Sequence, residues 1–144
     1  MLESTFLSGK VIKVSLPVLA APSGPEAPAR KRLLLPQGEL AQVYDSDEPI
    51  RYLAYIELRE HTVRGNHYHR IKEEMVYLIQ GELLLVVEDV HSKGREQVPL
   101  QTGDVAVIQP GVAHVLRILK AGHALEYSKT RFEAADTYRY PLGG

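Results

Sequence analysis

Two histidines separated by one residue are the sharpest chemical feature of this sequence. His67 and His69 stand in the run Arg64-Gly65-Asn66-His67-Tyr68-His69. In a β-strand, side chains two positions apart point to the same face, so both imidazoles would project together and could share one metal ion. The pair alone fits two exposed histidines on a strand equally well, because short motifs also arise by chance.

The residues that follow the pair have the spacing of two longer motifs. Four residues separate His69 from Glu74, and six separate Glu74 from Gly81. Further along, Gly103-Asp104 opens an apolar stretch that leads to Pro110-Gly111-Val112-Ala113-His114. The chain therefore carries a carboxylate shortly after the histidine pair, and a third histidine after a turn.

This combined pattern resembles the two motifs of the cupin superfamily. The first motif of that family joins an HxH pair to a glutamate and a closing glycine. The second runs from a glycine through a strand to a turn and a third histidine. The resemblance covers about residues 50–127 and implies the family's fold, an all-β double-stranded β-helix or jelly-roll barrel. It also implies four metal ligands, which are His67, His69, Glu74 and His114.

Three imidazoles and one carboxylate suit one divalent transition metal ion per chain: iron, manganese, nickel, cobalt, copper or zinc. Four protein ligands on one side of an octahedral ion leave positions for water, substrate or oxygen. Glu73 is the rival of Glu74 as the carboxylate ligand. Strand alternation favours Glu74, which shares a face with Val76 and Leu78, whereas Glu73 points the other way.

Two enzymatic functions fit this pattern. The main interpretation is a metal-dependent enzyme that acts on a small polar molecule as an oxygenase, isomerase or lyase. The alternative is a metal-independent ketoisomerase or epimerase of nucleotide sugars, with His67 and His69 as acid and base. Residues 64–69 are also similar to the RGxHxH stretch of sugar-nucleotide ketoisomerases and capsule-sugar cupins. That branch tends to carry Gln where this chain has Glu74 and Lys where it has Arg70, which favours the metal-dependent interpretation.

A non-catalytic small-molecule binder or sensor is a further alternative. It is disfavoured because the sequence shows no attached DNA-binding or signalling domain to which a sensor would report. An enzyme with a small-molecule substrate is therefore the preferred class.

Three other side chains are candidates for contact with the substrate. Arg64 stands beside the histidine pair and could bind a carboxylate or phosphate, or instead form an ion pair with Glu57 or Glu60. Tyr55 and Tyr127 could line the barrel, although core packing is the default role of such tyrosines. The remaining histidines are expected to be exposed and structural: His61, His91 and His123.

Short apolar runs separated by turn residues must position these side chains. About ten runs recur at spacings of roughly 8–12 residues, which is typical of an all-β sandwich or barrel. The expected strands lie at 11–16, 33–35, 40–43, 52–58, 75–79, 83–87, 88–91, 96–100, 105–108, 115–119 and 124–127. Gln80-Gly81-Glu82 is expected to form a tight hairpin turn, and Ala121-Gly122 to separate the last two strands.

The chain of 144 residues fits a single domain, residues 1–144. Its proline-rich segment 17–30 predicts a loop or mobile arm, and Phe132 to Tyr138 could form a short helix. Leu83 to Val87 is apolar on both faces, although a half-buried strand should alternate. A second subunit would cover the outer face, so we expect a homodimer.

Composition narrows the range of partners. Acidic and basic residues nearly cancel, 18 against 17, so nothing favours binding to nucleic acid or to a membrane surface. The absence of cysteine excludes disulfides and thiolate ligands. No run approaches the roughly 20 apolar residues that span a bilayer, and the first residues do not resemble a signal peptide. A cytoplasmic location is therefore expected.

Overall fold

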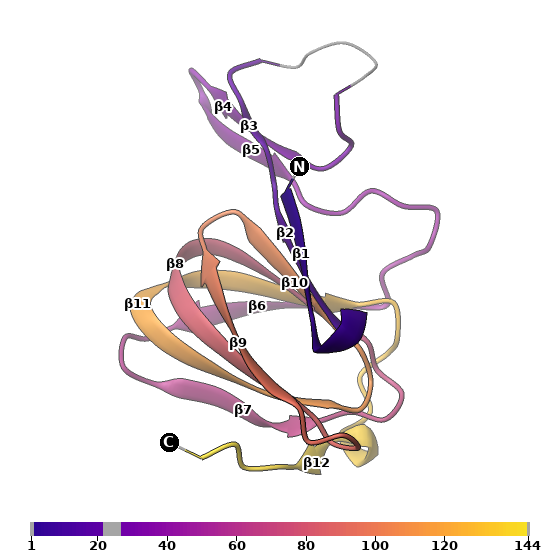
Figure 1. The fold of residues 1–144 in the computed structure, drawn as a ribbon. Coiled ribbons are helices and arrows are strands. Elements are labelled where there is room, and N and C mark those ends of the chain that lie inside the picture. Colours follow the sequence, from indigo (N-terminus) through magenta and orange to yellow (C-terminus); the bar gives the residue numbers. More distant parts are fainter. Residues whose placement is uncertain (1, 22–26, 144) are drawn as a thin grey trace.

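Strands form nearly all of the regular structure in the computed structural model, which describes residues 2–21 and 27–143 (Figure 1). The larger sheet contains β1 (Leu2–Phe6), β2 (Val11–Ser15), β6 (Tyr52–Leu58), β7 (Val63–Tyr68), β8 (Glu74–Asp89), β9 (Arg95–Gln101), β10 (Asp104–Ile108), β11 (Val112–Ser128) and β12 (Tyr138–Arg139). A smaller sheet contains β3 (Val18–Leu19), β4 (Lys31–Leu35) and β5 (Gly38–Gln42). Two 3₁₀ turns are η1 (Leu7–Gly9) and η2 (Ala134–Asp136). The predicted all-β jelly-roll barrel, a double-stranded β-helix, is confirmed.

The two longest strands, β8 and β11, each run through both walls of the barrel. Residues 75–78 of β8 pair with residues 124–127 of β11, in the wall that also contains β6, β10 and β2. Residues 82–89 of β8 pair with residues 112–120 of β11, in the wall that also contains β7 and β9. Figure 1 shows both strands curving around the interior, while the smaller sheet projects beyond the barrel.

The strands β8 and β11 bend and continue at two places where the sequence predicts a hairpin turn or a break between strands. Gly81 has a φ of +122°, and a Cβ atom there would lie 2.8 Å from the carbonyl oxygen of Lys120. A Cβ atom on Gly122 would lie 1.7 Å from the carbonyl oxygen of Gln80. The hairpin turn expected at 80–82 and the break expected at 121–122 are therefore wrong. Glycine at these positions allows two continuous strands to bend and cross closely, not to reverse.

The main core fills the space between the two walls. Alternate residues of β8 point inward, and Val76, Leu78, Leu83, Leu85 and Val87 are all buried there. Each such side chain contributes about 1.5–3 kcal/mol on removal from water. This alternation places Glu74 on the interior face, as the sequence predicts, and Met75 and Tyr77 on the outer face in a second cluster.

The outer face of the apolar run 83–87 is covered by the chain's own C-terminal segment. Val86 packs with Leu142 and with the half-buried Tyr140. The Tyr140 hydroxyl also donates a hydrogen bond to Glu88. The expectation that a second subunit covers this face is wrong, because residues 140–142, which are distant from β8 in the sequence, pack against it. The homodimer stays a prediction, without this argument.

The proline-rich segment is more ordered at its ends than the sequence predicts. Val18–Leu19 pairs in parallel with β4, and the part at 22–26 lies outside the described residues. The short helix expected at 132–138 is reduced to the 3₁₀ turn η2, followed by β12. Among the described residues, no helix is long and apolar enough to cross a membrane.

Candidate functional site

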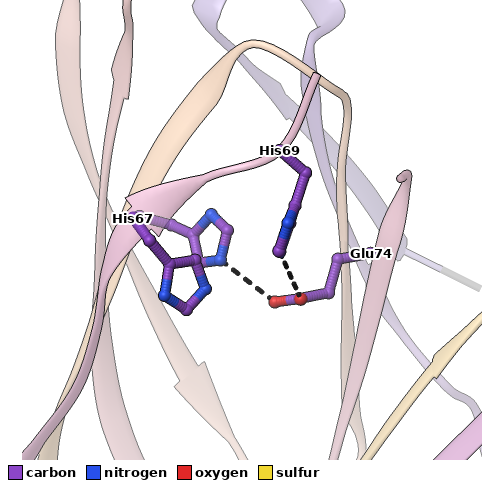
Figure 2. Close-up of side chains that lie close together, drawn as sticks. His67, His69 and Glu74 are labelled. Atoms are coloured by element: carbon purple, nitrogen blue, oxygen red, sulfur yellow. Dashed lines mark ion pairs between the residues drawn. The ribbon is translucent and has the colours of Figure 1, made fainter. Parts of the chain in front are cut away.

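The four residues of the predicted ligand set converge inside the barrel. His67 lies on β7, His69 follows the end of that strand, Glu74 begins β8, and His114 lies on β11. One nitrogen or oxygen of each residue lies within 4.8 Å of those of the other three. Figure 2 shows His67, His69 and Glu74 pointing toward one another. The geometry is that of a compact site that could hold one cation.

A close approach of β7 to β11 brings the histidines together. His67 and His114 are register partners, and the register shifts between His114 and Val115. Gly65 has a φ of +111°, and a Cβ atom there would lie 2.6 Å from the His114 carbonyl oxygen. Only glycine can occupy this position without displacing the backbone. The imidazole rings of His67 and His114 are consequently 4.8 Å apart, edge to face.

Glu74 is the centre of the cluster and is buried. Its carboxylate oxygens lie 3.4 Å from His69 Nε2 and 3.1 Å from His114 Nε2, as the dashed lines in Figure 2 mark. Burial alone would raise the pKa of Glu74, but His114, His69 and the Lys72 ammonium hold it well below its usual value. Burial would lower the pKa of His114, and the Glu74 charge outweighs this and raises it. Glu74 is therefore a carboxylate surrounded by groups that favour its charge.

Backbone carbonyl groups orient two of the imidazoles. His69 Nδ1 donates to the Asp136 carbonyl oxygen over 3.0 Å, and His114 Nδ1 donates to the Val112 carbonyl oxygen over 3.1 Å. With the proton held on Nδ1, each Nε2 of a neutral ring offers its lone pair to the interior. Both Nε2 atoms are buried and have no hydrogen-bond partner. Lone pairs that face a carboxylate require a cation between them, either a proton or a metal ion.

These residues fit a divalent metal ion. Metal-bound histidines usually donate their second ring N–H to a carbonyl or carboxylate, as His69 and His114 do. Nitrogen and oxygen donors of this kind suit the transition metals expected from the sequence. The fit rests on the two buried Nε2 atoms without partners and on the anionic Glu74.

His67 differs from the other two imidazoles because it is only half-buried and lines an open pocket. Burial and the neighbouring His114 lower its pKa to about 4. The ring is therefore neutral at pH 7 and can accept a proton. This places a neutral imidazole beside a histidine whose charged form is favoured by Glu74, which is a common arrangement of an acid and a base.

A pocket of about 330 Å³ opens from the cluster. It is lined by Ile56, Arg64, Gly65, His67, Glu74, Val76, His114, Leu116 and Glu126. Arg64 is exposed, so its guanidinium stands where the pocket meets solvent. The ion pairs considered for it go elsewhere, since Glu57 pairs with Arg59 and Glu60 pairs with His61.

The two tyrosines considered as candidates lie outside this pocket. Tyr55 is 62% exposed on the outer face of β6, where it stacks on His123. Tyr127 is buried in the outer cluster with Met75 and Tyr77, and burial raises its pKa. Neither side chain lines the pocket, because both sit on the outward parity of their strands, and Tyr127 has the core-packing role expected as its default.

The histidines outside the motifs also lie away from the cluster. His61 and His91 are exposed, as predicted. His123 is half-buried against Tyr55, on the outside of the barrel.

Two charged residues missed by the sequence reasoning complete the wall around Glu74. Lys72 is 3% exposed, and its ammonium lies 3.1 Å from Glu126 Oε1 and 3.5 Å from Glu74 Oε1. Burial and the charge of Glu74 raise the pKa of Glu126, although Lys72 opposes this. A signal was present in the sequence, because Glu126 is the one charged residue in the apolar run 124–127.

Asp136 is a third missed residue, and it holds the loop that carries His69. Its carboxylate accepts hydrogen bonds from the backbone N–H groups of Arg70, Ile71 and Lys72. Burial would raise the pKa of Asp136, but these three donors hold it below its usual value. Since Asp136 lies more than 60 residues from this loop, only the tertiary structure reveals the contact.

The family of the chain follows from its sequence motifs and fold together. Residues 54–126, half of the chain, match the family model described as a cupin domain. The chain belongs to the cupin family. No curated protein sequence matches it.

Solved structures with the same fold include enzymes of nucleotide-sugar metabolism. A TDP-quinovose 3,4-ketoisomerase from Campylobacter jejuni has a TM-score of 0.67 and 17% identity, covering 77% of this cupin and 88% of that chain. A dTDP-4-dehydrorhamnose 3,5-epimerase from Sulfolobus tokodaii has a TM-score of 0.70 and 17% identity, covering 90% and 76%. A 3,4-ketoisomerase from Thermoanaerobacterium thermosaccharolyticum, solved with TDP-4-keto-6-deoxyglucose, has a TM-score of 0.69 and 14% identity, covering 90% and 87%. At these identities the likeness concerns the fold.

Proposed function

We propose that this cupin is an isomerase or epimerase of a nucleotide-linked keto sugar. The observation that carries the proposal is the convergence of His67, Glu74 and His114 at a pocket where Arg64 stands at the solvent edge. The similar structures described above are of enzymes that isomerise or epimerise such sugars, which supports this substrate class. The proposal favours the alternative considered from the sequence over an oxygenase or lyase.

The chemistry needs a base beside a carbon atom next to a carbonyl, and a donor for the oxygen that becomes negative. Neutral His67 is placed to take the proton from that carbon. His114, whose protonated form is favoured by Glu74, is placed to donate to the carbonyl oxygen. The Arg64 guanidinium would bind the diphosphate of the nucleotide, since its planar donors match phosphate oxygens.

Solvent exchange tests this function directly. The protein is incubated with TDP-4-keto-6-deoxyglucose in deuterium oxide, and the sugar is followed by proton NMR. Deuterium should appear on the carbon atom next to the keto group. His67→Asn should slow this exchange about 10²–10⁴-fold, which is the usual contribution of a positioned base. His91→Asn, on the exposed surface, should leave the rate unchanged. Absence of exchange with the wild-type protein would exclude the proposal for this substrate.

A second proposal concerns a metal ion held by His67, His69, Glu74 and His114. It is favoured by the buried Nε2 atoms of His69 and His114, which have no hydrogen-bond partner. A bound divalent ion would supply Lewis-acid stabilisation of charge on a substrate oxygen.

Elemental analysis after extensive dialysis of untagged protein tests metal binding. We expect about one ion per chain, and loss of the ion in His114→Ala with the fold retained by circular dichroism. The matched control is His91→Ala, which should keep the metal. Protein that stays empty after addition of zinc, manganese or iron(II) would refute the metal site and leave the acid–base proposal standing.

A further inference from the structure

Glu126 is the proton-exchanging side chain that lines the pocket without belonging to the four-residue cluster. The other ionisable lining residue outside the cluster is Arg64, whose guanidinium stays charged and does not carry protons. The Glu126 side chain is 22% exposed, so it is accessible to a ligand in the pocket. It therefore has both the chemistry and the access that a catalytic group needs.

The two walls of the barrel present different groups to the pocket. His67 and His114 are paired on β7 and the first part of β11. Glu126 pairs with Val76 in the other wall, beside Glu74 at the start of β8. The His114–Glu74 contact of 3.1 Å spans the interior between these walls. The pocket is thus lined by imidazoles from one wall and by carboxyl groups from the other.

Lys72 holds Glu126 in this position. Its ammonium donates to Glu126 Oε1, while the rings of Tyr52 and Phe132 lie 4.3 and 5.5 Å from the same ammonium. The lysine is buried and restricted by these contacts, so the carboxyl group that it binds is also held in place. Lys72 is the hydrogen-bond donor to Glu126 among the described residues, and burial and the charge of the neighbouring Glu74 raise the pKa of Glu126. The side chain lines the pocket, where it can meet a substrate.

We propose that Glu126 is a second catalytic residue, placed opposite His67, and that the reaction inverts a carbon atom next to the keto group. His67 takes the proton from one face of that carbon, which leaves a planar enediolate. Glu126 gives its proton to the opposite face, so one C–H bond breaks and one forms. This inference rests on the proposed function, and it selects epimerisation over movement of the keto group.

The test compares Glu126→Gln, His67→Asn and the wild-type protein in deuterium oxide. The wild type should form an epimer of TDP-4-keto-6-deoxyglucose that carries deuterium at the inverted carbon. Both variants should form it about 10²–10⁴-fold more slowly. Glu126→Gln should still exchange the proton of the unreacted sugar, because His67 is intact, whereas His67→Asn should lose this exchange as well. A loss of structure alone would abolish exchange in both variants.

Glu57→Gln is the matched control, since Glu57 is exposed and pairs with Arg59 outside the pocket. It should keep the wild-type rate, and melting curves should show that every variant is folded at the temperature of the assay. A Glu126→Gln rate within threefold of the wild type would overturn the inference, as would a wild-type product with only the keto group moved. In both cases His67→Asn would still exchange the proton slowly, so the result would not contradict the proposed function. A wild-type protein without any exchange would overturn both.

Discussion

The two walls around the pocket are held in place by different forces. In the imidazole wall, which carries His67 and His114, ring orientation is set by a hydrogen bond to a backbone carbonyl and by the close approach of β7 to β11. In the carboxylate wall, which carries Glu74 and Glu126, the buried Lys72 pairs with both carboxylates. Backbone geometry therefore positions the imidazole rings, whereas a buried cation pairs with the carboxylates. This difference predicts that the two walls fail in different ways.

The largest effect is expected where the two walls join. Gly122→Ala would place a Cβ atom 1.7 Å from the Gln80 carbonyl oxygen, so one of the long strands must move. We expect a loss of more than about 4 kcal/mol in the free energy of unfolding, measured with urea. Gly111→Ala is the control, because open space surrounds it and only its φ of +82° is unfavourable, at about 1–2 kcal/mol. Equal losses in both variants would show that crossing of the strands is not the constraint.

Removal of the buried cation should destabilise the carboxylate wall. Lys72→Met leaves Glu126 without its ion-pair partner and removes one of the partners of Glu74, and breaking a buried ion pair from one side costs about 3–5 kcal/mol. Lys120→Met removes a lysine that pairs with Glu82 at the surface, where such pairs contribute about 1 kcal/mol or less. Unfolding by urea at pH 7 measures the free energy of unfolding of both variants. If both variants lose the same stability, charge does not hold this wall.

A smaller effect is expected for the loop beside the imidazole wall. Asp136→Ala removes the acceptor of three backbone N–H groups at residues 70–72, at a cost of about 1–3 kcal/mol. The backbone carbonyl that accepts from His69 remains, but the loop after His69 loses its anchor, which should weaken metal binding about 10–100-fold where metal is bound. Scanning calorimetry measures the loss of stability, and titration calorimetry with zinc measures the loss of metal affinity. Asp47→Ala, at an exposed position, should change neither, and an Asp136→Ala protein with wild-type affinity would contradict the assigned role.

The smallest effect is a pH dependence that arises from His67. Its pKa is about 4 in the folded protein and about 6.5 when unfolded, so the unfolded chain binds more protons between these values. Stability should be complete above pH 6.5 and fall as the pH decreases toward 4, by about 1.4 kcal/mol per pH unit at most. His67→Asn should flatten this slope in metal-free protein studied with a chelator. A variant with the slope of the wild type would show that another group titrates.

Strand periodicity explains which parts of the site the sequence predicts. His67 with His69, and Glu74 over Glu73, follow from alternation along a strand, which is a local property. The positions of Tyr55 and Tyr127 do not follow in this way, because alternation separates two faces without showing which one is inside. The stacking of His123 on Tyr55 identifies the outer face, but this contact exists only in the folded protein, where β6 pairs with β11.

The sequence by itself determined the all-β class, the cupin resemblance and the spacing of the four residues that meet in the pocket. These depend on short-range patterns of apolar residues, glycines and histidines. The tertiary structure decided that Gly81 and Gly122 bend two strands and do not end them, and that the C-terminal segment covers β8. It also decided that Lys72 and Glu126 face the site. Such contacts join residues that are distant in the chain. Their burial and their ion pairs form only when the two walls of the barrel pack together.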